Sequence, residues 1–125
     1  MDEEFLWQVL QNVVSNAINY SASESVVSVN ITVKKLNVEF EIQDTGIGIP
    51  AKEQHKIFNK FYRAKNAIKF LPQGSGLGLS LAKSLLEVWG GKIWFESKEG
   101  RGSSFFFTVP LKGVKPRKGE VTLAV

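Results

Sequence analysis

Cysteine is absent from the 125 residues, and histidine and methionine each occur only once. Without cysteine the chain can form neither disulfides nor thiolate metal sites, which is typical of proteins in the reducing cytoplasm. The sequence has no apolar run near the roughly 18 residues that a membrane-spanning helix needs. It also lacks the pattern of a secretory signal. These absences predict a cytoplasmic protein.

Most of the net positive charge lies at the C-terminal end of the chain. The net charge is +4, and residues 112–125 carry four basic residues against one acidic residue. The rest of the chain shows no basic patch interleaved with aromatic residues, so we expect no nucleic-acid binding. The length suits one domain around a single core. We therefore predict one domain over residues 1–110 and a basic tail over residues 111–125.

Residues 5–20 have the apolar spacing of a helix but contain no charged residue. Gln8, Asn12, Asn16 and Tyr20 follow one another at intervals of four and form an uncharged polar row. A solvated helical face normally carries charged side chains, and Asn is a poor residue for a helix interior. Two interpretations remain open from the residues alone. The amides either bond to neighbouring backbone, or they present oxygen ligands to a bound group.

Alternating apolar residues predict strands at residues 27–34, 38–43, 92–97 and 103–109. In the first strand, Val27, Val29, Ile31 and Val33 form the face expected to be half-buried. Asp44 continues the apolar register of the second strand, where a carboxylate is costly unless it has a strong partner. It either caps the turn that follows or faces a ligand, because Gly46 and Gly48 allow close approach of the backbone.

The middle of the chain predicts a short helix near residues 51–57, followed by an aromatic cluster. We expect Phe58 and Phe61 to belong to the core. Residues 64–73 show no clear period and are interpreted as a mobile loop. The glycine-rich residues 74–78 then open a helix, and such a segment at a helix start is typical of an anion site. The core face of this last helix is predicted to carry Leu77, Leu81, Leu85 and Val88.

The ordered set of motifs resembles the catalytic and ATP-binding domain of two-component sensor histidine kinases, within the GHKL ATPase family that includes DNA gyrase B and MutL. The matching segments are residues 12–21 (N box), 44–48 (G1 box), 58–63 (F box) and 74–79 (G2 box). The resemblance covers about residues 2–110. It implies an α+β fold, the two-layer Bergerat fold, with a mixed, mostly antiparallel sheet packed against about three helices.

The resemblance also implies that ATP and Mg²⁺ are the cofactors. Asn16 would bind the Mg²⁺ with Asn12 nearby, and Arg63 would lie near the γ-phosphate, so these three are the predicted catalytic residues. Asp44 would accept a hydrogen bond from the adenine amino group, and residues 64–75 would form the ATP lid. The predicted nucleotide-binding residues are Asn16, Asn19, Tyr20, Asp44, Gly46, Gly48, Ile49, Tyr62, Arg63, Gly74, Ser75, Gly76, Leu77, Gly78, Leu79 and Ser104.

Two residues decide which chemistry is expected. The gyrase and MutL branches hydrolyse ATP with a Glu at the position of Asn12, and an amide cannot act as a general base. The single histidine, His55, is followed by Lys and is interpreted as a solvated helix residue. We therefore expect phosphoryl transfer to a histidine on another domain.

The implied partners are the dimerisation and phosphoacceptor domain of a parent kinase and a response regulator receiver domain. The chain starts too late to contain the strand that usually precedes the N box, so we expect a fragment. We expect it to be monomeric and unable to phosphorylate itself. Asn19 departs from the family, which often has Lys there to contact phosphate. The alternatives are a GHKL serine kinase of the anti-sigma type and a degenerate nucleotide-binding scaffold.

Overall fold

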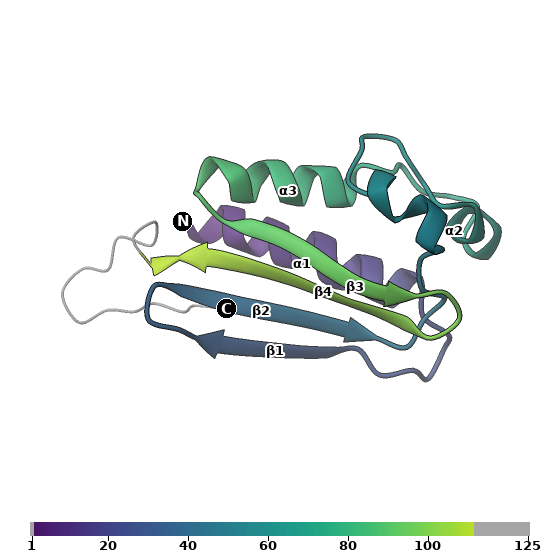
Figure 1. The fold of residues 1–125 in the computed structure, drawn as a ribbon, viewed down its shortest axis with the longest axis horizontal. Coiled ribbons are helices and arrows are strands. Elements are labelled where there is room, and N and C mark those ends of the chain that lie inside the picture. Colours follow the sequence, from purple (N-terminus) through teal and green to yellow (C-terminus); the bar gives the residue numbers. More distant parts are fainter. Residues whose placement is uncertain (1, 112–125) are drawn as a thin grey trace.

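The computed structural model describes residues 2–111, and their elements form two layers (Figure 1). One layer is an antiparallel sheet in the order β1-β2-β4-β3, and α1 and α3 cover one of its faces. The elements are α1 (Glu3–Asn19), β1 (Ser28–Val33), β2 (Asn37–Asp44), the 3-10 helix η1 (Ala51–Lys56), α2 (Lys65–Phe70), α3 (Gly78–Val88), β3 (Lys92–Lys98) and β4 (Gly102–Pro110). The predicted α+β fold is confirmed. Every strand pairing among residues 2–111 is antiparallel.

The first helix begins where its sequence predicts. The Asp2 side chain accepts a hydrogen bond from the Glu4 backbone N–H at 2.9 Å and caps the helix. The row Val9, Val13 and Ala17 is buried against the sheet and α3, as expected. The uncharged polar row lies on another side of α1 and is free to meet a different part of the molecule.

The core lies between the helices and the two central strands. β2 and β4 turn alternate residues toward α1 and α3, and the Phe40 and Phe107 rings stack with centroids 4.5 Å apart. The same alternation places Asp44 on the buried face at the end of β2, opposite Ser103 of β4. The apolar register of these strands therefore delivers a carboxylate to one end of the core.

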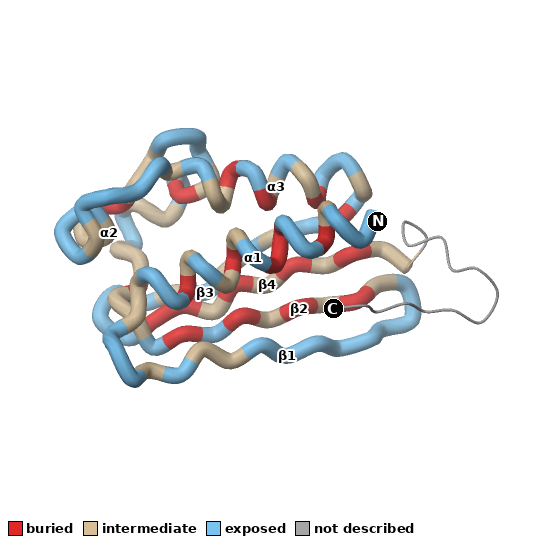
Figure 2. Tube along the Cα trace, turned by 180° about the vertical axis from the view of Figure 1, so that it is seen from behind, coloured by how far each residue is buried: buried red, intermediate tan, exposed pale blue. Residues whose placement is uncertain are grey.

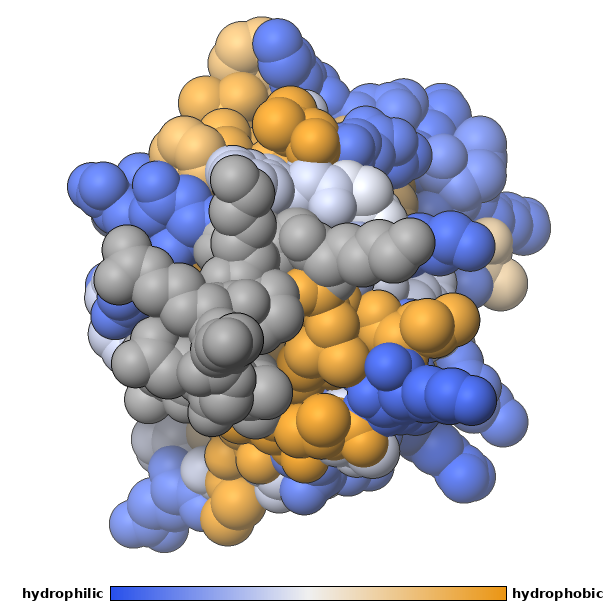
Figure 3. All heavy atoms as spheres, turned by 90° about the vertical axis from the view of Figure 1, so that its left-hand side faces the viewer, coloured by the Kyte–Doolittle hydropathy of each residue, from blue (hydrophilic) through white to orange (hydrophobic). Residues whose placement is uncertain are grey.

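The strand β1 is present, but its apolar face is not half-buried as predicted. Val29, Ile31 and Val33 are 42%, 41% and 57% exposed, and Figure 2 shows β1 as largely exposed. The reason is that β1 is an edge strand, whereas α1 packs over its neighbour β2. Figure 3 shows apolar side chains reaching the surface at the end of the molecule that carries the β1–β2 turn.

The helix α3 forms where expected but buries a different face. Its buried residues are Ser80, Ala82 and Leu86, whereas Leu77 and Leu81 are exposed. Leucines occur on every side of this helix, so spacing alone does not select the face that meets α1 and β3. No helix within residues 2–111 has the length and apolar character needed to cross a bilayer.

The aromatic cluster also differs from its prediction. Phe58 packs against Phe95 with ring centroids 5.8 Å apart, but Phe61 is 71% exposed and therefore does not belong to the core. Its backbone has a positive φ of 66° and its N–H donates to the Gly76 carbonyl at 2.9 Å. The backbone of Phe61, rather than its ring, is thus tied into the structure. Of the tail predicted over residues 111–125, only Leu111 is described, and its N–H donates to the Leu36 carbonyl at 3.0 Å. Residues 112–125 lie outside the described residues.

Candidate functional site

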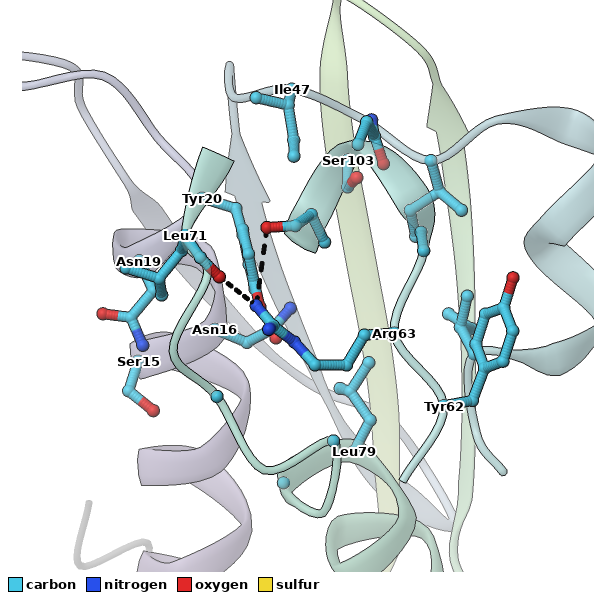
Figure 4. Close-up of a pocket in the computed structure, with 18 of the residues that line it drawn as sticks. Ser15, Asn16, Asn19, Tyr20, Ile47, Tyr62, Arg63, Leu71, Leu79 and Ser103 are labelled. Atoms are coloured by element: carbon cyan, nitrogen blue, oxygen red, sulfur yellow. Dashed lines mark hydrogen bonds between the residues drawn. The ribbon is translucent and has the colours of Figure 1, made fainter. Parts of the chain in front are cut away.

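A cavity of about 310 Å³ opens where the C-terminal half of α1 meets the loop after β2, α2 and the start of α3 (Figure 4). Most of the predicted site residues line it. These are Asn12, Asn16, Asn19, Tyr20, Asp44, Gly48, Ile49, Tyr62, Arg63, Gly74, Ser75, Gly76, Gly78 and Leu79. Segments that are far apart in sequence therefore converge as the motif order predicts.

One wall of the cavity is the uncharged row of α1. Asn12, Asn16 and Tyr20 line it, whereas Gln8 lies a turn too far toward the N-terminus. Neither the Asn12 nor the Asn16 side chain forms a hydrogen bond with another residue in the described part of the chain. The row has two interpretations. The structure favours amides that face a ligand over amides that form hydrogen bonds with neighbouring backbone.

Asp44 is a carboxylate held at the inner end of the cavity. It is only 8% exposed, and its Oδ1 accepts a hydrogen bond from the Gly46 N–H at 2.8 Å. Burial raises the pKa of Asp44, while the backbone N–H groups of Gly46 and Ser103 partly oppose that shift. A buried acceptor that is incompletely satisfied by the protein suits a ligand that brings its own N–H donor.

The loop after β2 owes its path to two glycines. A Cβ at Gly46 would lie 2.1 Å from the Tyr20 carbonyl oxygen, so this glycine seats the loop against the end of α1 and does not line the cavity. Gly48 has φ of +67°, and a Cβ there would lie 2.1 Å from the Lys98 carbonyl oxygen. Gly48 lines the cavity. Gly46 was predicted to contact the nucleotide, but its close contact is with the backbone of Tyr20.

We expect Gly48→Ala to lower the free energy of unfolding by more than Gly100→Ala. Both glycines have positive φ, but a Cβ at Gly100 meets nothing within 4 Å. Gly100→Ala should therefore cost only the backbone penalty of about 1–2 kcal/mol. Gly48→Ala adds a clash with backbone that cannot move aside. Urea unfolding of the two variants measures the difference, and equal losses would contradict the close approach.

The start of α3 supplies unpaired backbone donors. Its N-cap residue, Leu77, makes no side-chain cap hydrogen bond, so the first-turn N–H groups are available to an anion. Gly76 fixes the loop before it, because a Cβ there would lie 2.7 Å from the Phe61 backbone carbon. Gly74, Ser75, Gly76 and Gly78 line the cavity, whereas the predicted Leu77 does not.

Arg63 lies across the cavity with its guanidinium against protein oxygens (Figure 4). Nη2 donates to the Tyr20 hydroxyl at 2.8 Å and to the Leu71 carbonyl at 2.5 Å, and Nη1 donates to the Pro72 carbonyl at 3.1 Å. Tyr62 lines the cavity, but its hydroxyl is directed to Glu53. That hydrogen bond lowers the pKa of the Glu53 carboxyl.

The segment predicted as a mobile loop contains the short helix α2. Asn66 on this helix donates from Nδ2 to the Gly48 carbonyl at 2.9 Å and so ties the segment to the loop after β2. The prediction failed because six helical residues are too few to show a period. For the same reason the sequence did not indicate the cavity contacts of Asn66, Ala67, Leu71 and Gln73.

Other lining residues were also missed. Ser103, rather than the predicted Ser104, lines the cavity, because alternate residues of β4 face opposite sides of the sheet and Ser103 pairs with Asp44. Ser103 could have been identified from the strand register, because the residue that pairs with Asp44 lies on the same face of the sheet. The remaining unpredicted lining residues are Ser15, Ile47, Ile57, Ala64 and Phe105.

The oxygen donors of the cavity fit one kind of metal site. No group of three or more His, Cys, Asp or Glu residues gathers within residues 2–111, so the described chain has no preformed carboxylate cage. Asn12 and Asn16 instead offer neutral oxygens close to the start of α3, where the Asn12 Oδ1 lies 3.9 Å from the Cβ position of Gly78. Such a set fits a hard cation whose charge is balanced by ligand phosphates.

Comparison with known proteins decides the family. The family described as "Histidine kinase-, DNA gyrase B-, and HSP90-like ATPase" matches residues 1–113. The chain belongs to this family. The chain is also 40% identical to the sensor histidine kinase WalK of Bacillus subtilis strain 168 over 114 residues, which cover 90% of this chain and 19% of WalK. It thus spans about a fifth of that relative's length.

Solved structures agree with this family membership. The mycobacterial sensor histidine kinase MprB superposes with a TM-score of 0.79 at 29% identity, over 88% of this chain and 74% of that chain. Full-length ShkA in complex with AMPPNP superposes with a TM-score of 0.73 at 28% identity, over 87% and 22% of the two chains. The fold is therefore that of histidine kinase catalytic domains.

Proposed function

We propose that this chain binds Mg-ATP and donates the γ-phosphoryl group to a histidine on a separate dimerisation and phosphoacceptor domain of its parent kinase. The observation that carries the proposal is the pairing of a buried carboxylate, Asp44, with the open N-terminus of α3 at the edge of the same cavity. The first suits the amino group of a purine and the second suits phosphate. The similarity to ShkA, which is solved with AMPPNP, supports this choice of ligand.

Different residues of the cavity would bind different parts of the nucleotide. Asp44 accepts from the adenine amino group, and Tyr20 on α1 lies against the base. The N–H groups at the start of α3 receive the phosphates, and Arg63 is the one basic side chain in the described lining of the cavity. Asn16, with Asn12 beside it, would hold Mg²⁺, which neutralises phosphate charge when bound.

The same residues favour transfer over hydrolysis. Asp44 is the one carboxylate in the described lining of the cavity. Its proposed role is to bind the adenine amino group, so it does not activate water. Asn12 stands one helical turn before Asn16 and cannot remove a proton from water. His55 lies on η1 and does not line the cavity, so it is no acceptor within this site. The acceptor must therefore come from another domain, and a receiver domain would take the phosphoryl group in turn.

Calorimetry tests the nucleotide half of the proposal. We expect the chain to bind ADP and a non-hydrolysable ATP analogue with measurable heat, and we expect Mg²⁺ to strengthen binding of the analogue. GTP serves as the control, because it presents a carbonyl where adenine presents the amino group that Asp44 would accept from. Absence of heat and of any thermal shift with the adenine nucleotides would reject ATP binding.

A further inference from the structure

Both terminal nitrogens of the Arg63 guanidinium donate hydrogen bonds to oxygens of the protein. The two protons of Nη2 are shared among three oxygens, namely the Tyr20 hydroxyl at 2.8 Å and the carbonyls of Leu71 at 2.5 Å and Ala67 at 3.4 Å. Ala67 lies within α2, and Leu71 is the residue that follows the helix. Arg63 therefore links the segment 64–75 to the end of α1.

This linkage occupies the one basic residue in the described lining of the cavity, because neither Lys nor a second Arg lines it within residues 2–111. A guanidinium recognises phosphate through a fork of parallel N–H groups. Here Nη1 donates to Pro72 and Nη2 to Tyr20 and Leu71. The fork cannot serve phosphate and the 64–75 segment at once.

The linked arrangement leaves polar atoms unsatisfied at the base of the same segment. Arg63 Nε and Asn66 Oδ1 are both buried and have no hydrogen-bond partner among the described residues. A buried unpaired donor or acceptor costs about 1–3 kcal/mol. The arrangement around Arg63 is thus held by several bonds but is not the best that these groups could make.

We propose that Tyr20 is a positioning residue, and that its hydroxyl, together with the carbonyls of Ala67 and Leu71, holds Arg63 in a latch that nucleotide phosphates must open. The inference rests on the proposed function, because it requires phosphates to enter this cavity. Opening moves the guanidinium from the C-terminal end of α2 to the phosphates. The apparent affinity for a triphosphate is then the affinity of the open state multiplied by the fraction of molecules in which the latch is open.

The substitution Tyr20→Phe tests the latch because it removes one hydroxyl and keeps the ring. We expect the variant to bind a non-hydrolysable Mg-ATP analogue at least about tenfold more tightly than the wild type, from the loss of one hydrogen bond to a charged group. Adenosine has no phosphate to compete for Arg63, so any change in its binding should be smaller than the gain for the analogue. Tyr62→Phe is the matched control: it removes a hydroxyl bonded to Glu53 instead of Arg63, and it should not gain affinity.

A second variant, Gly74→Ala, disrupts the latch while the Tyr20 hydroxyl stays in place. A Cβ at Gly74 would lie 2.8 Å from Arg63 Cζ, so Gly74→Ala displaces the latched guanidinium without removing a hydrogen-bonding group. It should also bind the analogue more tightly, and combining Tyr20→Phe with Arg63→Ala should remove the gain of Tyr20→Phe.

The sign of the affinity change decides between the latch and a direct contact. Unchanged analogue binding by folded Tyr20→Phe would overturn the latch. Weaker binding would overturn it as well and would assign the hydroxyl to direct support of the nucleotide. If wild-type protein binds neither adenosine nor the analogue, the proposed function itself fails, and this outcome is distinct from failure of the latch alone.

Discussion

Asp44→Asn is expected to lower the affinity for ADP and for ATP analogues by about 10- to 100-fold while the protein remains folded. The carboxylate lies at the inner end of the cavity, with one oxygen held by the Gly46 N–H at 2.8 Å. An amide can keep that bond, but it turns its NH₂ group, a donor, toward the adenine amino group. Two donors then face each other, and the base loses its partner.

The stability of the variant separates recognition from folding. Burial raises the pKa of Asp44, so the folded protein holds this proton more readily than the unfolded chain. Ionised Asp44 therefore opposes folding, and its unfavourable contribution grows as pH rises from 3.8, the ordinary pKa of an Asp carboxyl, through the raised pKa of Asp44. At neutral pH, Asp44→Asn should unfold at the same or a higher urea concentration than the wild type.

Asp2→Asn is the matched control for this experiment. It removes the same charge from the cap of α1, and Asn caps a helix as well as Asp. Nucleotide affinity should be unchanged in Asp2→Asn. A folded Asp44→Asn protein with wild-type affinity for ADP would show that the carboxylate does not recognise adenine.

Asn16→Ala is expected to remove the effect of Mg²⁺ on binding of the ATP analogue. Its side chain lines the cavity without a partner among residues 2–111, so no internal hydrogen bond is lost with it. We expect the variant to bind about tenfold or more weakly than the wild type in Mg²⁺, because metal sites lose roughly 10- to 100-fold when a supporting group is removed. In EDTA the two proteins should bind alike.

Ser15→Ala is the control for Asn16→Ala. Ser15 lines the same wall, but its hydroxyl donates to the Asn12 backbone carbonyl at 3.4 Å. Its loss should leave the Mg²⁺ dependence in place. If Asn16→Ala retains the full Mg²⁺ dependence of the wild type, the metal is held elsewhere.

The sequence predicted the elements of this fold better than the faces they bury. The strands and the long helices carry clear periods, so their existence followed from local spacing. The exposure of Val29 and Ile31 depends on α1 lying over β2 rather than β1, and no local period reports that placement. The face of α3 was ambiguous because Leu77, Leu81 and Leu86 all fit a helix.

The candidate site was predictable where a motif fixes the backbone and was missed where contacts depend on tertiary packing. Asp44 was identified because it places a carboxylate in the apolar register of its strand, and Asn16 because an uncharged helix row is unusual. Asn66 has no such signal, since its bond to the Gly48 carbonyl exists only after the chain has folded. The exposure of Phe61 is likewise set by the contact of its backbone with Gly76.

The proposed transfer of the γ-phosphoryl group to a histidine on another domain can be measured in trans. The chain would be mixed with the purified phosphoacceptor hairpin of its parent kinase and with ATP labelled in the γ-phosphate. We expect label on the hairpin that is lost in acid and kept in base, as for phosphohistidine. We expect no label when Asp44→Asn replaces the wild type. Acid-stable label on a serine, or release of labelled phosphate with none on the hairpin, would contradict the proposed transfer.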